Sequence, residues 1–156
     1  MSFVEVKRFA EASKWDRCFL QWATRAADMS KDPRKKVGAL LVSPDRRTIA
    51  YGYNGFPRGL ADDERLEDKT KKNLRTVHAE LNAVLNARTD LTGWTLYCTS
   101  APCHDCAKAL CQTGIARVVT VQPAESSSWS GSIHLGTEML NECGVSILWV
   151  TQYDYL

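Results

Sequence analysis

The chain has 156 residues, 44% of them hydrophobic, and its 20 basic and 18 acidic side chains give a formal net charge of +2. This length predicts one compact domain over residues 1–156, and the composition excludes a disordered chain or a membrane-spanning one, because no run of about 18 apolar residues occurs. The balanced charge argues against nucleic acid as a partner, since proteins that track phosphates carry a basic stripe.

Apolar residues at three- and four-residue steps predict a first helix over residues 13–29. Two short apolar runs, 37–42 and 48–53, flank a Ser-Pro-Asp turn and predict a β-hairpin. After a loop rich in Asn and Gly, a charged run over 62–75 holds five acidic and five basic residues, which we interpret as a solvated, self-compensating surface. Helices and strands then alternate, with helices predicted over 78–88, 103–112 and 133–141, and strands over 94–98, 118–121 and 145–150.

This alternation predicts an α/β fold. Strands that alternate with helices pair in parallel, and the helices then cover both faces of the sheet. The N-terminal hairpin adds antiparallel pairing. We therefore expect a three-layer α/β/α domain with a five-stranded mixed sheet.

Two short motifs carry side chains that bind metals: His-Ala-Glu at 78–80 and Pro-Cys-His-Asp-Cys at 102–106, each predicted to open a helix. Cysteines three apart share a helix face, so Cys103 and Cys106 can hold one ion while His104 points away. With the imidazole of His78 they make three protein ligands for tetrahedral zinc. The fourth position stays open for water, as in catalytic rather than structural zinc sites.

Glu80 is the remaining acidic group of the first motif, and we expect it to transfer protons. It would take a proton from water, pass one to a ring nitrogen of the substrate and then assist the departure of ammonia. Residues two apart in a helix point to opposite sides, so this arrangement requires His78 to stand at the helix entry.

Simpler interpretations exist for each motif alone. A lone His-x-Glu has no meaning, and a lone Cys-x-x-Cys is commonly a structural half-site or a pair of core cysteines. A fourth ligand from Cys98 would close the site. The other cysteines lie in apolar patterns and are expected to be reduced thiols. The two motifs together, with the proline and about 22 residues between them, match the signature of zinc deaminases.

Residues 30–122, about three-fifths of the chain, resemble the cytidine deaminase superfamily, and within it the deoxycytidylate deaminase branch. The matching stretches are SKDP at 30–33, VGA at 37–39, GYNGFPRG at 52–59, VHAELNA at 77–83 and SAPC at 100–103. The zinc motifs belong to the whole superfamily. The Asn-Gly-x-Pro-x-Gly loop is more discriminating, because it is typical of the nucleotide branch.

The resemblance implies roles in substrate binding. Asn54 would hydrogen-bond the sugar or base, and the backbone amide of Ala79 would meet the base carbonyl, although an Asn-Gly pair is also a common plain turn. For a substrate phosphate, Lys36, Arg34 and Arg58 lie near the expected rim, and Lys36 and Arg58 are our candidates, each of which could instead be a solvated surface charge.

The resemblance also bears on cofactor and partners. Some phage-type relatives hold a second zinc with extra Cys and His residues before the His-Ala-Glu motif; residues 60–77 have neither, so we expect one Zn2+ per chain. The expected partner is a small nucleotide, with no membrane involved. A homo-oligomer is expected, hexamers being common in the family. The first eight residues lack a signal-peptide pattern, which predicts a cytoplasmic location.

The leading functional hypothesis is a zinc-dependent dCMP deaminase. The alternative within enzymes is a deaminase of another small heterocycle: a free nucleoside, dCTP, a modified cytosine nucleotide, or a pterin or riboflavin precursor. A nucleic-acid deaminase is disfavoured by the charge balance and by Ala101, where the tRNA-editing branch usually has Glu. A catalytically silent zinc-bearing regulator is disfavoured by the intact Glu80.

Overall fold

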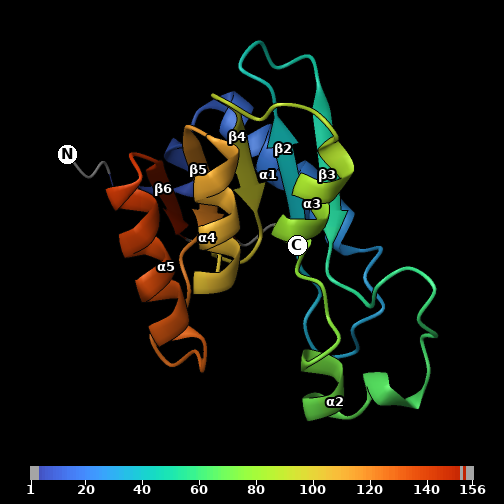
Figure 1. Ribbon diagram of the computed structural model, residues 1–156. Coiled ribbons are helices and arrows are strands. Elements are labelled where there is room, and N and C mark those ends of the chain that lie inside the picture. Colours follow the sequence, from blue (N-terminus) through green and yellow to red (C-terminus); the bar gives the residue numbers. More distant parts are fainter. Residues whose placement is uncertain (1–3, 152, 154–156) are drawn as a thin grey trace.

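The computed structural model describes residues 4–151 and 153 (Figure 1). A six-stranded mixed sheet has the order β1-β6-β5-β4-β2-β3. The strands are β1 (Val4–Arg8), β2 (Gly38–Val42), β3 (Ile49–Tyr53), β4 (Thr95–Cys98), β5 (Arg117–Val121) and β6 (Ser146–Thr151). The α-helices are α1 (Lys14–Ala27), α2 (Lys69–Asn73), α3 (Ala79–Ala87), α4 (His104–Thr113) and α5 (Ser130–Glu142), and short 3-10 helices lie at Phe9–Glu11 and Glu64–Leu66.

The sheet combines an antiparallel and a parallel part. Strands β2 and β3 form the predicted hairpin, and β2 also pairs antiparallel with β4. Strands β4, β5, β6 and β1 are mutually parallel. The mixed α/β prediction is confirmed, but the expected number of five strands is wrong, because β1 adds a sixth at the edge beside β6. Val4 and Val6 of β1 are 44% and 56% exposed, so this strand has no buried face to mark it as part of a core.

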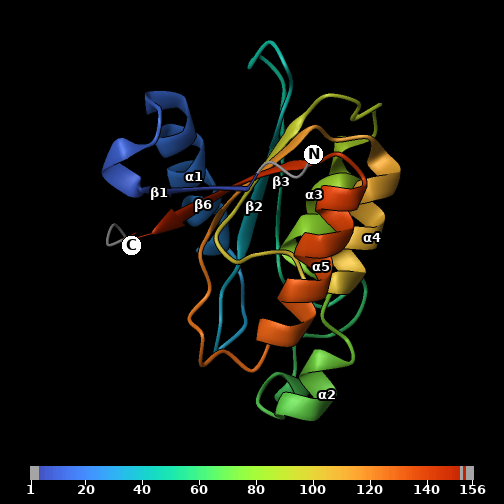
Figure 2. The ribbon, with the colours of Figure 1, turned by 90° about the vertical axis from the view of Figure 1, so that its left-hand side faces the viewer.

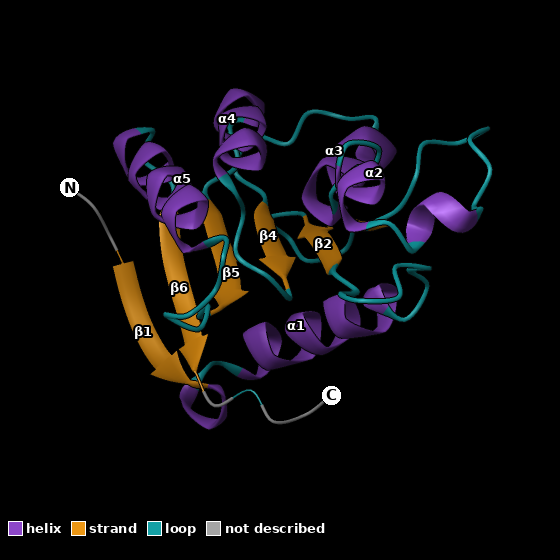
Figure 3. Cartoon of the chain, turned by 90° about the horizontal axis from the view of Figure 1, so that it is seen from below, coloured by secondary structure: helices purple, strands orange, loops and turns teal. Residues whose placement is uncertain are grey.

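Helices cover both faces of the sheet, as the three-layer prediction requires. Figures 2 and 3 show α1 on one face and α3, α4 and α5 together on the other. Side chains alternate along each strand, so neighbouring residues serve different cores. In β2, Leu40 packs with Phe19 and Leu20 of α1, whereas Leu41 packs with Ala83 of α3 and other residues of the second core.

The two predicted motifs lie at the starts of α3 and α4, on the sheet face that α3, α4 and α5 cover. His78 is the N-cap of α3 and Cys103 is the N-cap of α4, and both have extended backbone dihedral angles. Helix α4 follows the carboxyl end of β4 after a short connection. Within the described residues, no helix combines the length and the apolar character needed to cross a bilayer.

Candidate metal centre and substrate cavity

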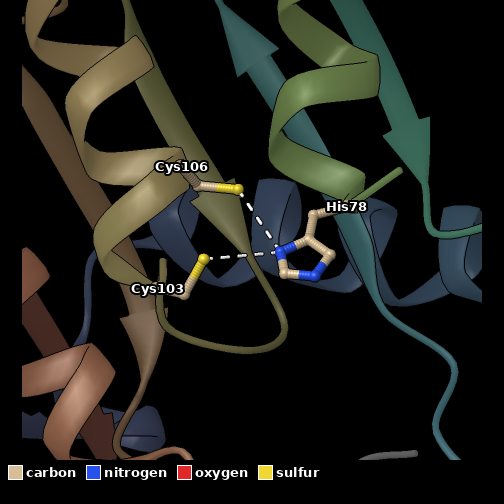
Figure 4. Close-up of side chains that lie close together, drawn as sticks. All are labelled: His78, Cys103 and Cys106. Atoms are coloured by element: carbon tan, nitrogen blue, oxygen red, sulfur yellow. Dashed lines mark hydrogen bonds between the residues drawn. The ribbon is translucent and has the colours of Figure 1, made fainter. Parts of the chain in front are cut away.

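Three metal-binding side chains converge between the starts of α3 and α4. The Nδ1 atom of His78 lies 3.4 Å from the Sγ atom of Cys103 and 3.5 Å from that of Cys106 (Figure 4). The three candidate ligand atoms all lie within 4.8 Å of one another. They form the one such cluster among residues 4–151 and 153, and Cys98 is not part of it.

This geometry fits a zinc ion. Zinc bonds of about 2.3 Å to sulfur and 2.0 Å to nitrogen, at tetrahedral angles, place the ligand atoms about 3.5 Å apart. The two measured sulfur–nitrogen distances agree with that separation. Because three protein ligands leave one tetrahedral position unfilled, the donor set is that of a catalytic site with one zinc per chain.

The positions of the ligands follow from helix capping. His78 stands at the entry of α3, so its side chain and that of Glu80 need not point to opposite sides of the helix. The start of α4 carries both cysteines, and backbone N–H groups there favour negative charge. Hydrogen bonds from Cys106 and His78 lower the pKa of Cys103, which favours the thiolate form that metals bind. His104 is turned away, with its Nδ1 atom 2.7 Å from the Ser132 hydroxyl.

Glu80 lies inside the same site. Its side chain is 3% exposed, and its Oε2 atom is 3.8 Å from the Sγ atom of Cys106. Burial raises the pKa of Glu80 above its ordinary value. A carboxyl group with a raised pKa holds a proton more readily than an exposed one, which suits Glu80 to accept a proton and then release it during a reaction.

A cavity opens onto this cluster. Its wall includes His78, Glu80 and Cys103, the expected substrate contacts Asn54 and Ala79, and a set of polar and basic residues from other elements: Asp32, Arg34, Lys35, Lys69, Lys72, Asn73, Thr76 and Ser100. Metal ligands, a buried acid and cations therefore face one space.

Asn54 and Ala79 offer different polar groups to the cavity, a side-chain amide and a backbone N–H group. The side chain of Asn54 accepts a hydrogen bond from the Val37 amide at 2.8 Å and donates one to the Lys35 carbonyl at 2.9 Å, so it is held in one orientation. Ala79 is the first residue of α3, where backbone N–H groups lack partners within the helix. The role of each in binding a substrate stays a prediction.

The cations in the cavity wall differ from our two candidates for phosphate binding. Lys36 and Arg58 are exposed and do not line the cavity; Arg58 instead donates to the side-chain oxygen of Asn86 at 3.2 Å. The wall contains Arg34, Lys35 and Lys69. In the described part of the chain, these three form no ion pair with a carboxylate, whereas Lys72 is paired with Asp32.

Trp129 is a cavity residue that the sequence reasoning did not assign to the site. It lies in the loop before α5, is 40% exposed, and packs edge-on against His78 with ring centroids 5.8 Å apart. An exposed aromatic side chain beside metal ligands is suited to contact a planar ring.

Comparisons with known proteins agree with this geometry. The family described as cytidine and deoxycytidylate deaminase zinc-binding region matches residues 13–122. The deoxycytidylate deaminase of Mycobacterium phage D29 is 44% identical over 126 residues, covering 72% of this chain and 96% of that protein. The human deoxycytidylate deaminase is 36% identical over 126 residues, covering 76% of this chain and 71% of that protein.

Solved structures give the same result. The crystal structure of dCMP deaminase from the cyanophage S-TIM5 in complex with dCMP and dUMP superimposes with a TM-score of 0.71 at 26% identity, covering 88% of this chain and 98% of that one. The similarity therefore includes the fold over most of the chain as well as the motifs.

Proposed function

The chain belongs to the cytidine and deoxycytidylate deaminase family, and on that premise we propose that its reaction is the hydrolytic deamination of dCMP, giving dUMP and ammonia. The phage and human relatives are named deoxycytidylate deaminases, and the S-TIM5 structure holds dCMP and dUMP. One observation on this chain carries the proposal: a single cavity joins the metal cluster and buried Glu80 to a wall with three cations that no carboxylate of the described residues pairs with.

The residues divide the chemistry between them. His78, Cys103 and Cys106 hold the zinc, which supplies a Lewis acid that makes water nucleophilic near neutral pH. Glu80 takes the proton that water releases as its oxygen bonds to the amino-bearing ring carbon. It delivers that proton to the adjacent ring nitrogen. It then moves the remaining proton of the new hydroxyl group to the amine, so that the carbon–nitrogen bond breaks, the carbonyl forms and ammonia leaves. The burial of Glu80 keeps bulk water from competing for the proton.

Recognition of the pyrimidine uses backbone and side-chain groups. The amide of Ala79, which has no partner within α3, donates to the base carbonyl, and Asn54, fixed by Val37 and Lys35, contacts the sugar or base. Trp129 packs against the ring from the side of His78. A free nucleoside would satisfy all of these contacts equally well.

The cations favour a nucleotide over a nucleoside. Arg34 and Lys35 direct donors to neutral oxygens, the Glu67 carbonyl and the Ser100 hydroxyl, so their charges are available to a phosphate. Lys69 adds a third charge from α2. We place the monophosphate against this wall rather than at Lys36 or Arg58.

The test is ammonia release by the zinc-loaded protein from dCMP, deoxycytidine and dCTP, with a Glu80→Ala variant as the inactive control. We expect the highest kcat/KM on dCMP. Equal kcat/KM values for dCMP and deoxycytidine would show that the phosphate does not contribute to recognition. If the zinc-bound protein released no ammonia from any of the three, dCMP would be rejected as the substrate. Modified nucleotides and pterin or riboflavin precursors would then be the substrates to test.

Homo-oligomeric assembly and a cytoplasmic location stay predictions. Light scattering of the purified protein measures the first, and fractionation of the source cells measures the second.

A further inference from the structure

A buried ion pair lies in the cavity wall, outside the metal centre. The Nζ atom of Lys72 contacts the two carboxylate oxygens of Asp32 at 2.6 and 2.7 Å, and the two residues are 5% and 7% exposed. They are 40 residues apart in the sequence. Both line the cavity, and neither belongs to the hydrophobic cores that flank the sheet.

Asp32 also organises the loop that contains it. Its Oδ1 atom accepts hydrogen bonds from the backbone amides of Arg34 and Lys35 at 2.8 and 3.0 Å, and its Oδ2 atom lies 3.4 Å from the Nδ2 atom of Asn54. One carboxylate thus contacts Lys72 and the three cavity residues assigned above to the sugar and phosphate.

Lys72 connects this loop to residues 61–77, called here the 61–77 segment, which includes α2. Figure 1 shows α2 projecting beyond the end of the sheet. Two other contacts reach the segment from the same loop: Lys31 pairs with Asp62 at 2.6 Å, and Arg34 donates to the Glu67 carbonyl at 2.8 Å. Side-chain exposure of 68% and 34% makes the Lys31 pair a weak restraint, because solvent screens it.

We propose that Asp32 and Lys72 are a positioning pair: their buried contact holds the 61–77 segment against the Asp32 loop and so assembles the nucleotide-binding wall of the cavity. The inference rests on the proposed function for its substrate. Lys72 does not itself bind phosphate, because Asp32 already neutralises it at short distance. Its effect reaches the substrate through Lys69 on the same helix and through Thr76, whose hydroxyl donates to the Lys72 carbonyl at 2.9 Å.

The first experiment compares Lys72→Met with Lys71→Met. Lys71 precedes it on α2. Its side chain is 61% exposed and its Nζ atom lies 3.8 Å from the Asp68 carboxylate, so its replacement removes the same charge without the buried contact. In the absence of substrate, we expect faster backbone hydrogen exchange over the 61–77 segment in Lys72→Met, with exchange in α4 and one bound zinc per chain unchanged. Lys71→Met should match the wild type in hydrogen exchange over both regions and in bound zinc.

Kinetics supply the second measurement. We expect Lys72→Met to raise the KM for dCMP about tenfold or more, the cost of a lost charge-assisted contact, with a smaller change in kcat. Lys72→Met also leaves the Asp32 charge buried without its cation, which lowers stability in its own right. The double variant Asp32→Asn/Lys72→Met removes that charge. Its Tm should recover toward the wild type while the KM stays raised.

Recovery of the KM together with the Tm would show that the pair only stabilises the fold, and would overturn the proposal. Unchanged exchange over the 61–77 segment in Lys72→Met would overturn it as well. If the wild type turned over no cytosine nucleotide, the proposed function would fail separately, because the exchange measurement needs no substrate. If Lys72→Met did not fold, hydrogen exchange and the KM for dCMP would both be measured on the double variant.

Discussion

Gly52 sets how closely α3 lies on the sheet, and replacing it by alanine should disturb the metal centre. A Cβ atom at Gly52 would lie 2.4 Å from the Ala79 carbonyl oxygen and 2.4 Å from the Ala83 nitrogen. An ordinary contact begins near 3.4 Å, so α3 and β3 must separate by about 1 Å. Because His78 caps this helix and its Nδ1 atom must stay within about 0.2 Å of its place to bind metal, we expect weaker zinc binding.

The energetic cost of Gly52→Ala can be estimated from the contacts that break. Overpacking costs about 1–3 kcal/mol. Asn82 and Asn86 of α3 donate to carbonyls of β3 at 2.8 and 2.9 Å, and a 1 Å separation lengthens both bonds beyond useful range, at about 1 kcal/mol each. Alanine lowers the conformational entropy of the unfolded chain and so stabilises the folded state by about 0.4–1 kcal/mol, which is too little to offset these losses. We therefore expect a net loss of about 2–4 kcal/mol and a fall in Tm of about 5–15 °C.

The assay is thermal unfolding of the metal-free protein together with zinc competition against a chelator. Gly131→Ala is the matched control, because its Cβ position has no neighbour within 4 Å among the described residues beyond its own turn of helix, and alanine favours the helix. An unchanged Tm in Gly52→Ala would refute the steric argument. A lowered Tm with unchanged zinc affinity would mean that the edge strand β3 moves and α3 does not.

Three further predictions concern other parts of the molecule. Glu80→Ala keeps zinc but loses turnover, whereas Cys103→Ala loses zinc and stability; equal zinc loss, measured by metal analysis, would make Glu80 a ligand. Arg34→Met raises the KM for dCMP more than that for deoxycytidine, and an equal change in both would place the phosphate elsewhere. Burial raises the pKa of Asp16, but the hydrogen bonds and charge of Arg117 and the hydrogen bond of Tyr97 outweigh it and hold that pKa below its ordinary value. Stability from this carboxylate is therefore complete above about pH 5 and is lost as the pH falls through the folded-state pKa, so the Tm advantage of the wild type over Asp16→Asn narrows between about pH 5 and pH 3.

The elements with one buried face could be predicted from the sequence, because burial imposes a period. Helix α1 repeats apolar residues toward β2, and helices α3 and α4 begin at motifs whose spacing also defines the metal ligands. Strand β1 was missed although Val4 and Val6 alternate with charged residues. Its two valines remain half exposed, so the pattern is that of an edge strand and carries little hydrophobic signal.

The charged run before α3 shows the limit of local reasoning. We interpreted residues 62–75 as a solvated surface, and this is wrong for Lys72, which is 5% exposed. The run holds five chemically similar bases, and only a carboxylate from a distant loop distinguishes Lys72 from its neighbours. The same limit applies to the phosphate candidates. Lys36, Arg34 and Arg58 all lie near the motifs in the sequence, but of these three only Arg34 lines the cavity, because proximity in sequence does not determine which cation faces it.

The two sides of the cavity rest on different kinds of structure, which separates chemistry from recognition. The metal ligands and Glu80 stand on the first turns of α3 and α4, and both helices are fixed to the sheet by fully buried residues such as Ala79, Ala83 and Ala107. The nucleotide-binding wall instead consists of loops and the short helix α2, which polar contacts around Asp32 hold together. Loops held by a few polar contacts open at lower free energy than helices packed on a core. Substitutions on the helix side should therefore change zinc affinity and kcat, whereas substitutions in the loops should change KM and the choice between nucleotide and nucleoside.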